Sequence, residues 1–174
     1  MAGVIFIRVN QISMFYRISL FFISLLQGVS VYAQNEITFT AEPKVQQVAE
    51  AYALDCIDFV KGQFKLELDG SDESILKLEP ILDNLSNYVK TKGMPPERVE
   101  TFSKMFGFYI GETYRKNHGG VTWGRVSING QNYHGLGKTD TNEAFIWPVA
   151  NVAKRIHLGS EANIAIYYSA IIVN

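Results

Sequence analysis

The sequence predicts a single α+β domain in which helices come first, a small antiparallel sheet follows, and one or two short helices end the chain. Two observations carry this prediction. Apolar residues recur at spacings of three and four up to about residue 118, which is typical of amphipathic helices. Beyond that point β-forming residues flank Asn129-Gly130, a dipeptide that favours a tight hairpin.

The first 33 residues predict a secretory signal peptide. They contain arginines but no acidic residue, an apolar run over 18–26, and a small residue, Ala33, before the expected cleavage point. Met14 is an alternative start to Met1, because residues 14–17 supply a basic region by themselves. An uncleaved anchor is the other interpretation, but the run is shorter than the roughly 20 residues that span a membrane. We therefore expect a periplasmic or secreted protein with no stable membrane insertion after cleavage.

Composition restricts the class of the remaining domain, residues 34–174. Apolar residues make up 47% of the chain, enough for a core, and the net charge of −1 gives no basic surface for nucleic acid. The single cysteine, Cys56, cannot form an internal disulfide. Its apolar helical surroundings predict a buried thiol, and a nucleophilic role has no neighbouring histidine in the sequence to support it.

The domain begins with an extended lead, Glu36–Phe39. Thr40 is expected to cap a helix over about 41–61, whose apolar residues fall on one face. Alternation over 64–68 then predicts a short strand or extended segment.

A second helical region starts at Ser71, a residue that caps helices well, and ends near Lys92. Pro80 interrupts its pattern, so we expect a kink or two shorter helices. The third helix opens at Pro96 and ends near Asn117.

Two glycines, Gly107 and Gly111, lie one turn apart inside this third helix. Each costs roughly 1 kcal/mol of helix propensity relative to alanine. We expect this loss to be offset by close approach of another element, either the final helix or the hairpin.

The sheet is expected to consist of a hairpin and a third strand. The hairpin strands are 121–128 and 131–136, with a bulge at Gly124, where the alternation changes phase. The third strand is 144–147.

Two short segments follow the sheet. Pro148 starts a short helix that ends at Gly159. The spacing over 164–171 favours a last helix, although its β-branched end also suits a strand.

Glu112 is the best acid–base candidate, because it lies at the edge of the apolar stripe of the third helix, where burial would raise its pKa. Two alternatives are structural. Glu112 can pair on its own helix with Arg115 or Lys116, or it can form a buried ion pair with Lys154 or Arg155.

Three histidines occur, and none pairs with another at metal-ligand spacing. His118 could complete an acid–base pair with Glu112, or simply cap the C-terminal end of its helix. His134 lies on a hairpin strand and is expected at the surface or in cross-strand packing, and His157 lies in a last helical turn. We predict no metal and no cofactor.

Aromatic and polar residues of the second half form a candidate recognition patch, if the sheet has one open face. Its members are Trp123, Tyr133, His134 and Trp147.

Three stretches follow one another in a recognisable order. They are 68–74 (LDGSDES), 108–112 (FYIGE) leading to Gly119-Gly120-x-x-Trp123, and Trp147-Pro148 leading to 154–156 (KRI) and 159–161 (GSE). Together they resemble a group of small bacterial α+β domains found among hypothetical and immunity-like proteins, over about residues 64–170. The resemblance implies the fold and points away from a standard enzyme, and it carries no catalytic residues.

These observations favour an exported, non-enzymatic binding protein with a protein partner. One form of it is an immunity or inhibitor protein that blocks a toxic enzyme. The alternative is a periplasmic hydrolase that uses Glu112 and a histidine as its acid–base pair.

Overall fold

The computed structural model describes residues 36–173, which belong to one compact unit, Asn35–Asn174. The expected signal peptide and its cleavage point lie outside the described residues. The elements, in chain order, are β1 (Ile37–Ala41), α2 (Pro43–Phe64), α3 (Asp72–Leu76), α4 (Leu78–Lys92), α5 (Pro96–His118), β2 (Val121–Ile128), β3 (Gln131–Lys138), β4 (Ala144–Ile146), α6 (Pro148–Leu158), a 3₁₀ turn (Ser160–Ala162) and α7 (Ile164–Ile172).

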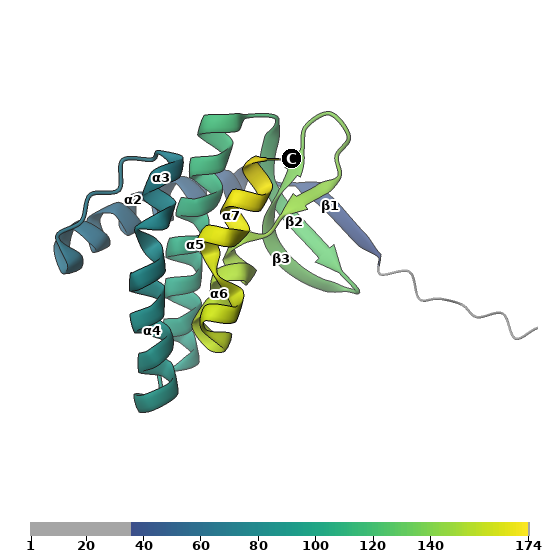
Figure 1. Ribbon diagram of the computed structural model, residues 1–174. Coiled ribbons are helices and arrows are strands. Elements are labelled where there is room, and N and C mark those ends of the chain that lie inside the picture. Colours follow the sequence, from purple (N-terminus) through teal and green to yellow (C-terminus); the bar gives the residue numbers. More distant parts are fainter. Residues whose placement is uncertain (1–35, 174) are drawn as a thin grey trace, which may run out of the picture. The chain divides into compact units, whose positions relative to one another are not determined.

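The fold is α+β, as the sequence predicts. A four-stranded antiparallel sheet has the order β1-β2-β3-β4. In Figure 1 the helices gather on one side of this sheet, with the long helix α5 next to it. The sheet therefore has two edge strands, β1 and β4.

The expected extended lead is a strand of the sheet, β1, and it is longer than expected. It pairs with β2 from Ile37 opposite Ile128 to Ala41 opposite Gly124. Thr40 lies within this strand and does not cap the helix. The residue before α2 is Glu42, and Pro43 is the first helical residue, where its missing N–H costs nothing.

Two expectations about the segment between α2 and α4 need correction. Residues 64–68 form no strand: α2 continues to Phe64, and Lys65 then takes a left-handed conformation, with φ of 56°, that ends the helix. Two helices do replace one around Pro80, but the break lies at Lys77. Pro80 sits in the first turn of α4, where proline is tolerated.

The hairpin is confirmed, with Asn129 and Gly130 both at positive φ, 51° and 81°, as a tight two-residue turn requires. The expected bulge at Gly124 is wrong, because pairing with β3 and with β1 continues through it. The ladder is irregular instead between Leu136 and Gly137. A side chain is excluded at Gly124 for another reason, because an added Cβ would lie 2.8 Å from the ring of Phe39.

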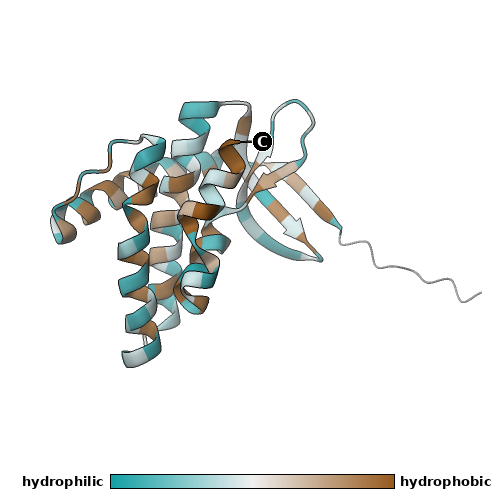
Figure 2. Ribbon diagram, in the orientation of Figure 1, coloured by the Kyte–Doolittle hydropathy of each residue, from teal (hydrophilic) through white to brown (hydrophobic). Residues whose placement is uncertain are grey.

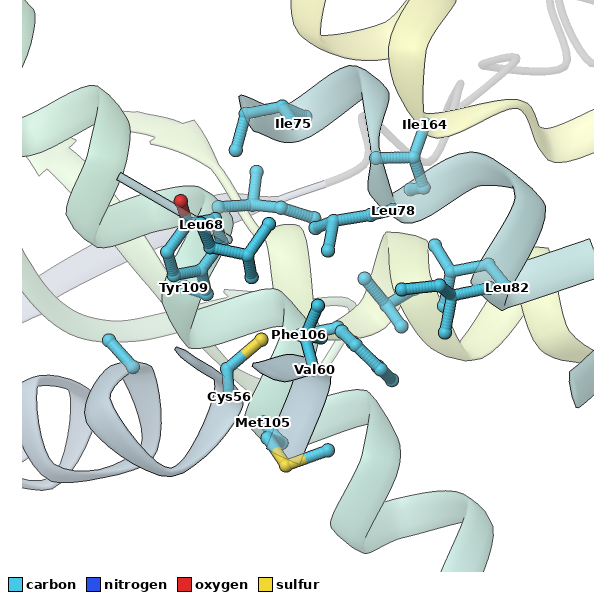
Figure 3. Packing of buried hydrophobic residues seen from close by; sticks show 14 of the residues in the cluster. Cys56, Val60, Leu68, Ile75, Leu78, Leu82, Met105, Phe106, Tyr109 and Ile164 are labelled. Carbon is cyan, nitrogen blue, oxygen red and sulfur yellow. The ribbon is translucent and has the colours of Figure 1, made fainter. Parts of the chain in front are cut away.

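The apolar interior forms two clusters of buried side chains. The larger one joins the helices, with Cys56, Leu78, Phe106 and Ile156 among its fully buried members, and Figure 3 shows several of its residues converging. Figure 2 shows apolar residues alternating with polar ones along these helices, which fits their one-sided burial. The smaller cluster lies between α2, α5 and the sheet.

The glycines of α5 do permit close packing. An added Cβ on Gly107 would lie 2.4 Å from the Cα of Val149 in α6. One on Gly111 would lie 2.3 Å from the ring of Trp123 in β2 and 3.2 Å from Pro148. The hairpin is therefore one packing partner, as expected, and α6 is the other in place of the final helix.

The last segment is the helix α7, as the spacing favours. A buried arginine supports this end of the chain. Arg155 donates to Glu79 at 2.9 Å and to Asp83 at 3.0 Å, which fastens α6 to α4. Glu79 also accepts the backbone N–H of Ile164, the first residue of α7.

Candidate functional site

Glu112 is buried and held by three donors. Its side chain is 2% exposed. The guanidinium of Arg115 donates to both of its carboxylate oxygens, at 2.7 and 2.9 Å, and Nε1 of Trp123 donates to Oε1 at 2.7 Å. Lys116 lies 3.5 Å away. The network extends from Arg115 to Glu50 of α2 at 3.2 Å, so it joins α2, α5 and β2.

The electrostatics of this network do not suit a general acid. Burial raises the pKa of Glu112, but the hydrogen bonds from Arg115 and Trp123 outweigh it, and the net pKa is lowered. Glu112 therefore stays ionised at neutral pH. The expected pair between Glu112 and His118 is not formed, and the alternative of a pair with Arg115 on the same helix is what the structure shows. Of the two candidates for a buried pair, Arg155 is bound to acids of α4 and Lys154 is exposed.

His118 has a different carboxylate partner. As the last residue of α5, it places Nε2 at 3.0 Å from Oδ2 of Asp72, and the ring of Tyr114 stacks on it at 4.7 Å. Asp72 also accepts from the hydroxyl of Tyr168 at 2.6 Å and the amide of Asn117 at 2.9 Å. Burial raises the pKa of Asp72, but these hydrogen bonds lower it further than burial raises it. The cluster joins α3, α5 and α7, which is a structural role.

Cys56 is fully buried, and burial raises the pKa of its thiol. A neutral thiol enclosed in the core is a poor nucleophile. The expectation of a buried, structural cysteine is confirmed.

The candidate recognition residues separate into different environments. Trp123 is 0% exposed and packs on Phe108 and Gly111, so its assignment to a binding surface is wrong. Tyr133 is half-buried and donates its hydroxyl to Gln131. His134 is exposed, and its ring lies tilted against that of Phe108, with 5.6 Å between the ring centres.

Trp147, by contrast, lines an open groove of about 470 Å³ between the two edge strands. This size falls within the usual range of ligand sites, about 300–1,000 Å³. One wall comes from β1 and the other from β4 and the loop before it. The lining residues are Ile37, Thr38, Phe39, Asn142, Glu143, Ala144, Phe145 and Trp147. We call this surface the edge groove.

Glycines in the sheet make room for the ring of Phe39, one of the residues that line the edge groove. An added Cβ on Gly137 would lie 2.3 Å from the ring of Phe39, and the Cβ of Gly124 would approach the same ring. The ring of Phe39 therefore lies where side chains of β2 and β3 would otherwise stand, and it is 7% exposed. Ile37, two residues earlier on the same strand, is 47% exposed and offers apolar surface to a ligand.

The sequence contains a signal for this site that local pattern reasoning missed. Residues 36–42, EITFTAE, alternate apolar and polar side chains between two acidic ends, which is typical of a strand. The sequence does not reveal that this strand lies opposite β4, because the two segments are far apart in the chain.

Within residues 36–173, no cluster of three or more His, Cys, Asp or Glu side chains is arranged to hold a metal ion. In the same range, no helix has the length and apolar character needed to cross a membrane.

No family model matches the chain, and no curated protein matches it. Its fold is similar to that of a crystal structure of a protein from Bacteroides thetaiotaomicron, with a TM-score of 0.54 and 13% sequence identity. The match covers 81% of this chain and 49% of the other, so this chain spans about half the length of that protein. The likeness supports the α+β fold.

Proposed function

We propose that this chain is an exported binding protein with a protein partner, and that the edge groove is its binding surface. The observation that carries the proposal is the position of Trp147, Phe145 and Ile37, three apolar side chains that line one open groove. Aromatic anchors in a groove are common centres of binding energy in protein interfaces. Export rests on the basic and apolar pattern of the first 33 residues.

The environments of the potentially reactive side chains favour a binding role over an enzymatic one. Glu112 is an ionised partner of Arg115 and Trp123, His118 is bound to Asp72, and Cys56 is enclosed. Each has a structural use, and the hydrolase alternative loses the Glu112–histidine pair on which it depends. An immunity or inhibitor protein is one form of the binding role, and the resemblance of the three sequence stretches favours it.

Capture of the partner tests this proposal. The mature chain, residues 34–174, is tagged and used to retain proteins from a periplasmic extract, together with the variants Ile37→Ser and Trp147→Ala. Leu54→Ala serves as the control, because Leu54 is an exposed apolar residue of α2, 64% exposed, that does not line the edge groove. Circular dichroism establishes that each variant is folded.

We expect the wild type and Leu54→Ala to retain the same protein, and both groove variants to lose it. Retention that survives both groove substitutions, or that is lost in Leu54→Ala, would show that the edge groove is not the binding surface. Reproducible retention of cell-wall fragments in place of a protein would contradict the protein partner itself.

A further inference from the structure

We infer that the ligand of the edge groove is an extended segment of the partner protein, which pairs as an added strand with the free edge of β1 and carries Lys or Arg at its ends. This inference rests on the proposed function, because it specifies how the edge groove binds.

The backbone of β1 presents to the groove hydrogen-bonding groups that pair with no other strand among residues 36–173. The carbonyl of Glu36 accepts from Asn129, and the N–H of Glu42 donates to the carbonyl of Trp123, so even-numbered residues face β2. In an antiparallel ladder the backbone N–H and C=O groups of successive residues point alternately to the two edges of the strand. The N–H and C=O groups of Ile37, Phe39 and Ala41 therefore point to the opposite edge, where an incoming strand would pair.

Side chains on both walls suit such a strand. Phe145, Trp147 and Ile37 line the same groove, and together they provide apolar surface for the alternate side chains of an extended segment. Natural sheets usually protect an edge strand of this kind with lysine, proline or a bulge. β1 contains none of these within Ile37–Ala41.

Charge at the groove selects the ligand. Acidic residues stand at both ends of β1, Glu36 and Glu42, and Glu143 stands on the opposite wall. Glu42 has a partner, Arg125 at 3.4 Å, and Lys138 lies over the ring of Phe145 at 5.9 Å. Glu36 and Glu143 form no ion pair within the described residues. A strand with basic ends is complementary to this arrangement, and one with acidic ends is repelled.

The same charges disfavour a second copy of the chain as the ligand. If two β1 edges paired antiparallel over their full length, with Phe39 opposite Phe39, Glu36 of each copy would face Glu42 of the other. Like charges directly opposite each other destabilise a pair of strands. The acidic ends therefore act against self-association and leave the edge available for a partner.

Three capped synthetic peptides test the inference by isothermal titration with the mature chain. The first is Lys-Ile-Thr-Val-Thr-Val-Lys, the second has Glu at both ends, and the third is the first with alternate backbone amides methylated. We expect the first peptide to bind about tenfold more tightly than the second. Methylation on the pairing edge should abolish binding, because it removes the hydrogen bonds of the added strand.

Variants of the chain supply the matched controls. Ile37→Pro removes an N–H that points to the groove and that β2 does not use, so the fold should be kept, as proline is tolerated at the first residue of an edge strand, while peptide binding is lost. Ile37→Val should bind normally. Glu36→Lys combined with Glu143→Lys should reverse the preference between the first two peptides.

Several results would overturn the inference. They are failure of all three peptides to bind at millimolar concentration, equal binding of the methylated peptide, absence of any preference between basic and acidic ends, or dimerisation of the chain alone through β1. If the peptides fail while Trp147→Ala still abolishes retention of the natural partner, the edge groove remains the binding surface and only the added strand is wrong.

Discussion

The substitution Gly111→Ala tests the close packing of helix α5 against the sheet. The added Cβ would lie 2.3 Å from Cζ2 and 2.4 Å from Cη2 of Trp123, far inside van der Waals contact. The indole cannot move aside easily, because it is fully buried and its Nε1 is bound to Glu112 at 2.7 Å. Pro148, at 3.2 Å, closes the remaining space.

The expected size follows from two opposing effects. Alanine in place of glycine inside a helix gains roughly 1 kcal/mol. Overpacking a rigid core costs typically 1–3 kcal/mol, and a ring held by a hydrogen bond places Gly111 near the upper end. We therefore expect a net loss of about 2 kcal/mol in the free energy of unfolding, and a larger loss for Gly111→Leu.

Gly62→Ala is the matched control. Gly62 also lies in a helix, α2, but an added Cβ there meets nothing within 4 Å, so this variant should gain up to about 1 kcal/mol. Urea denaturation of both variants, followed by circular dichroism, gives the two free energies of unfolding. If Gly111→Ala is at least as stable as the wild type, the close contact between α5 and Trp123 does not exist as described.

Three further outcomes are expected. The pKa of Glu112 is lowered in the folded state, so its contribution to stability is present above its unfolded pKa of about 4.3 and is lost as the pH falls through the lower folded value. Between pH 7 and pH 3, urea denaturation should therefore show a smaller decrease in the free energy of unfolding for Glu112→Gln than for the wild type. Equal decreases would contradict the direction of this pKa shift. Arg155→Leu should lower the free energy of unfolding by about 3–5 kcal/mol in the same assay, because Glu79 is left largely buried without its cation. A decrease below about 1 kcal/mol would show that the pair contributes no more than a surface ion pair. Cys56 should react with a thiol reagent only after unfolding, because its thiol is enclosed and its pKa raised, and rapid reaction of the native chain would be inconsistent with the burial described.

Local patterns predicted the parts of the fold that depend on neighbouring residues. Asn129-Gly130 specified the hairpin, because both residues tolerate the positive φ that its turn needs. The pair between Glu112 and Arg115 was open to prediction for the same reason, since i, i+3 side chains meet on one helix face. Strand β1 was harder to predict, because its pairing with β2 joins segments far apart in the sequence.

The candidate site residues also differ in whether local sequence patterns could identify them. Trp147 lines the edge groove, whereas Trp123 is buried and cannot belong to a binding surface. The two tryptophans look alike in sequence. Gly111 distinguishes them, because its missing side chain lets α5 cover Trp123, and such a tertiary contact leaves no local pattern. Ile37 was not recognised because the edge groove exists only when β1 and β4 are both in place.

Site-specific photo-crosslinking in living cells tests the edge groove as the binding surface most directly. A photoreactive phenylalanine analogue is placed at Ile37, in the edge groove, or at Leu54, a more exposed apolar position on α2. We expect one partner protein to be crosslinked from position 37 and none from position 54. Crosslinking from position 54 alone, or from neither position while the tagged chain still retains its partner, would contradict the assignment of binding to the edge groove.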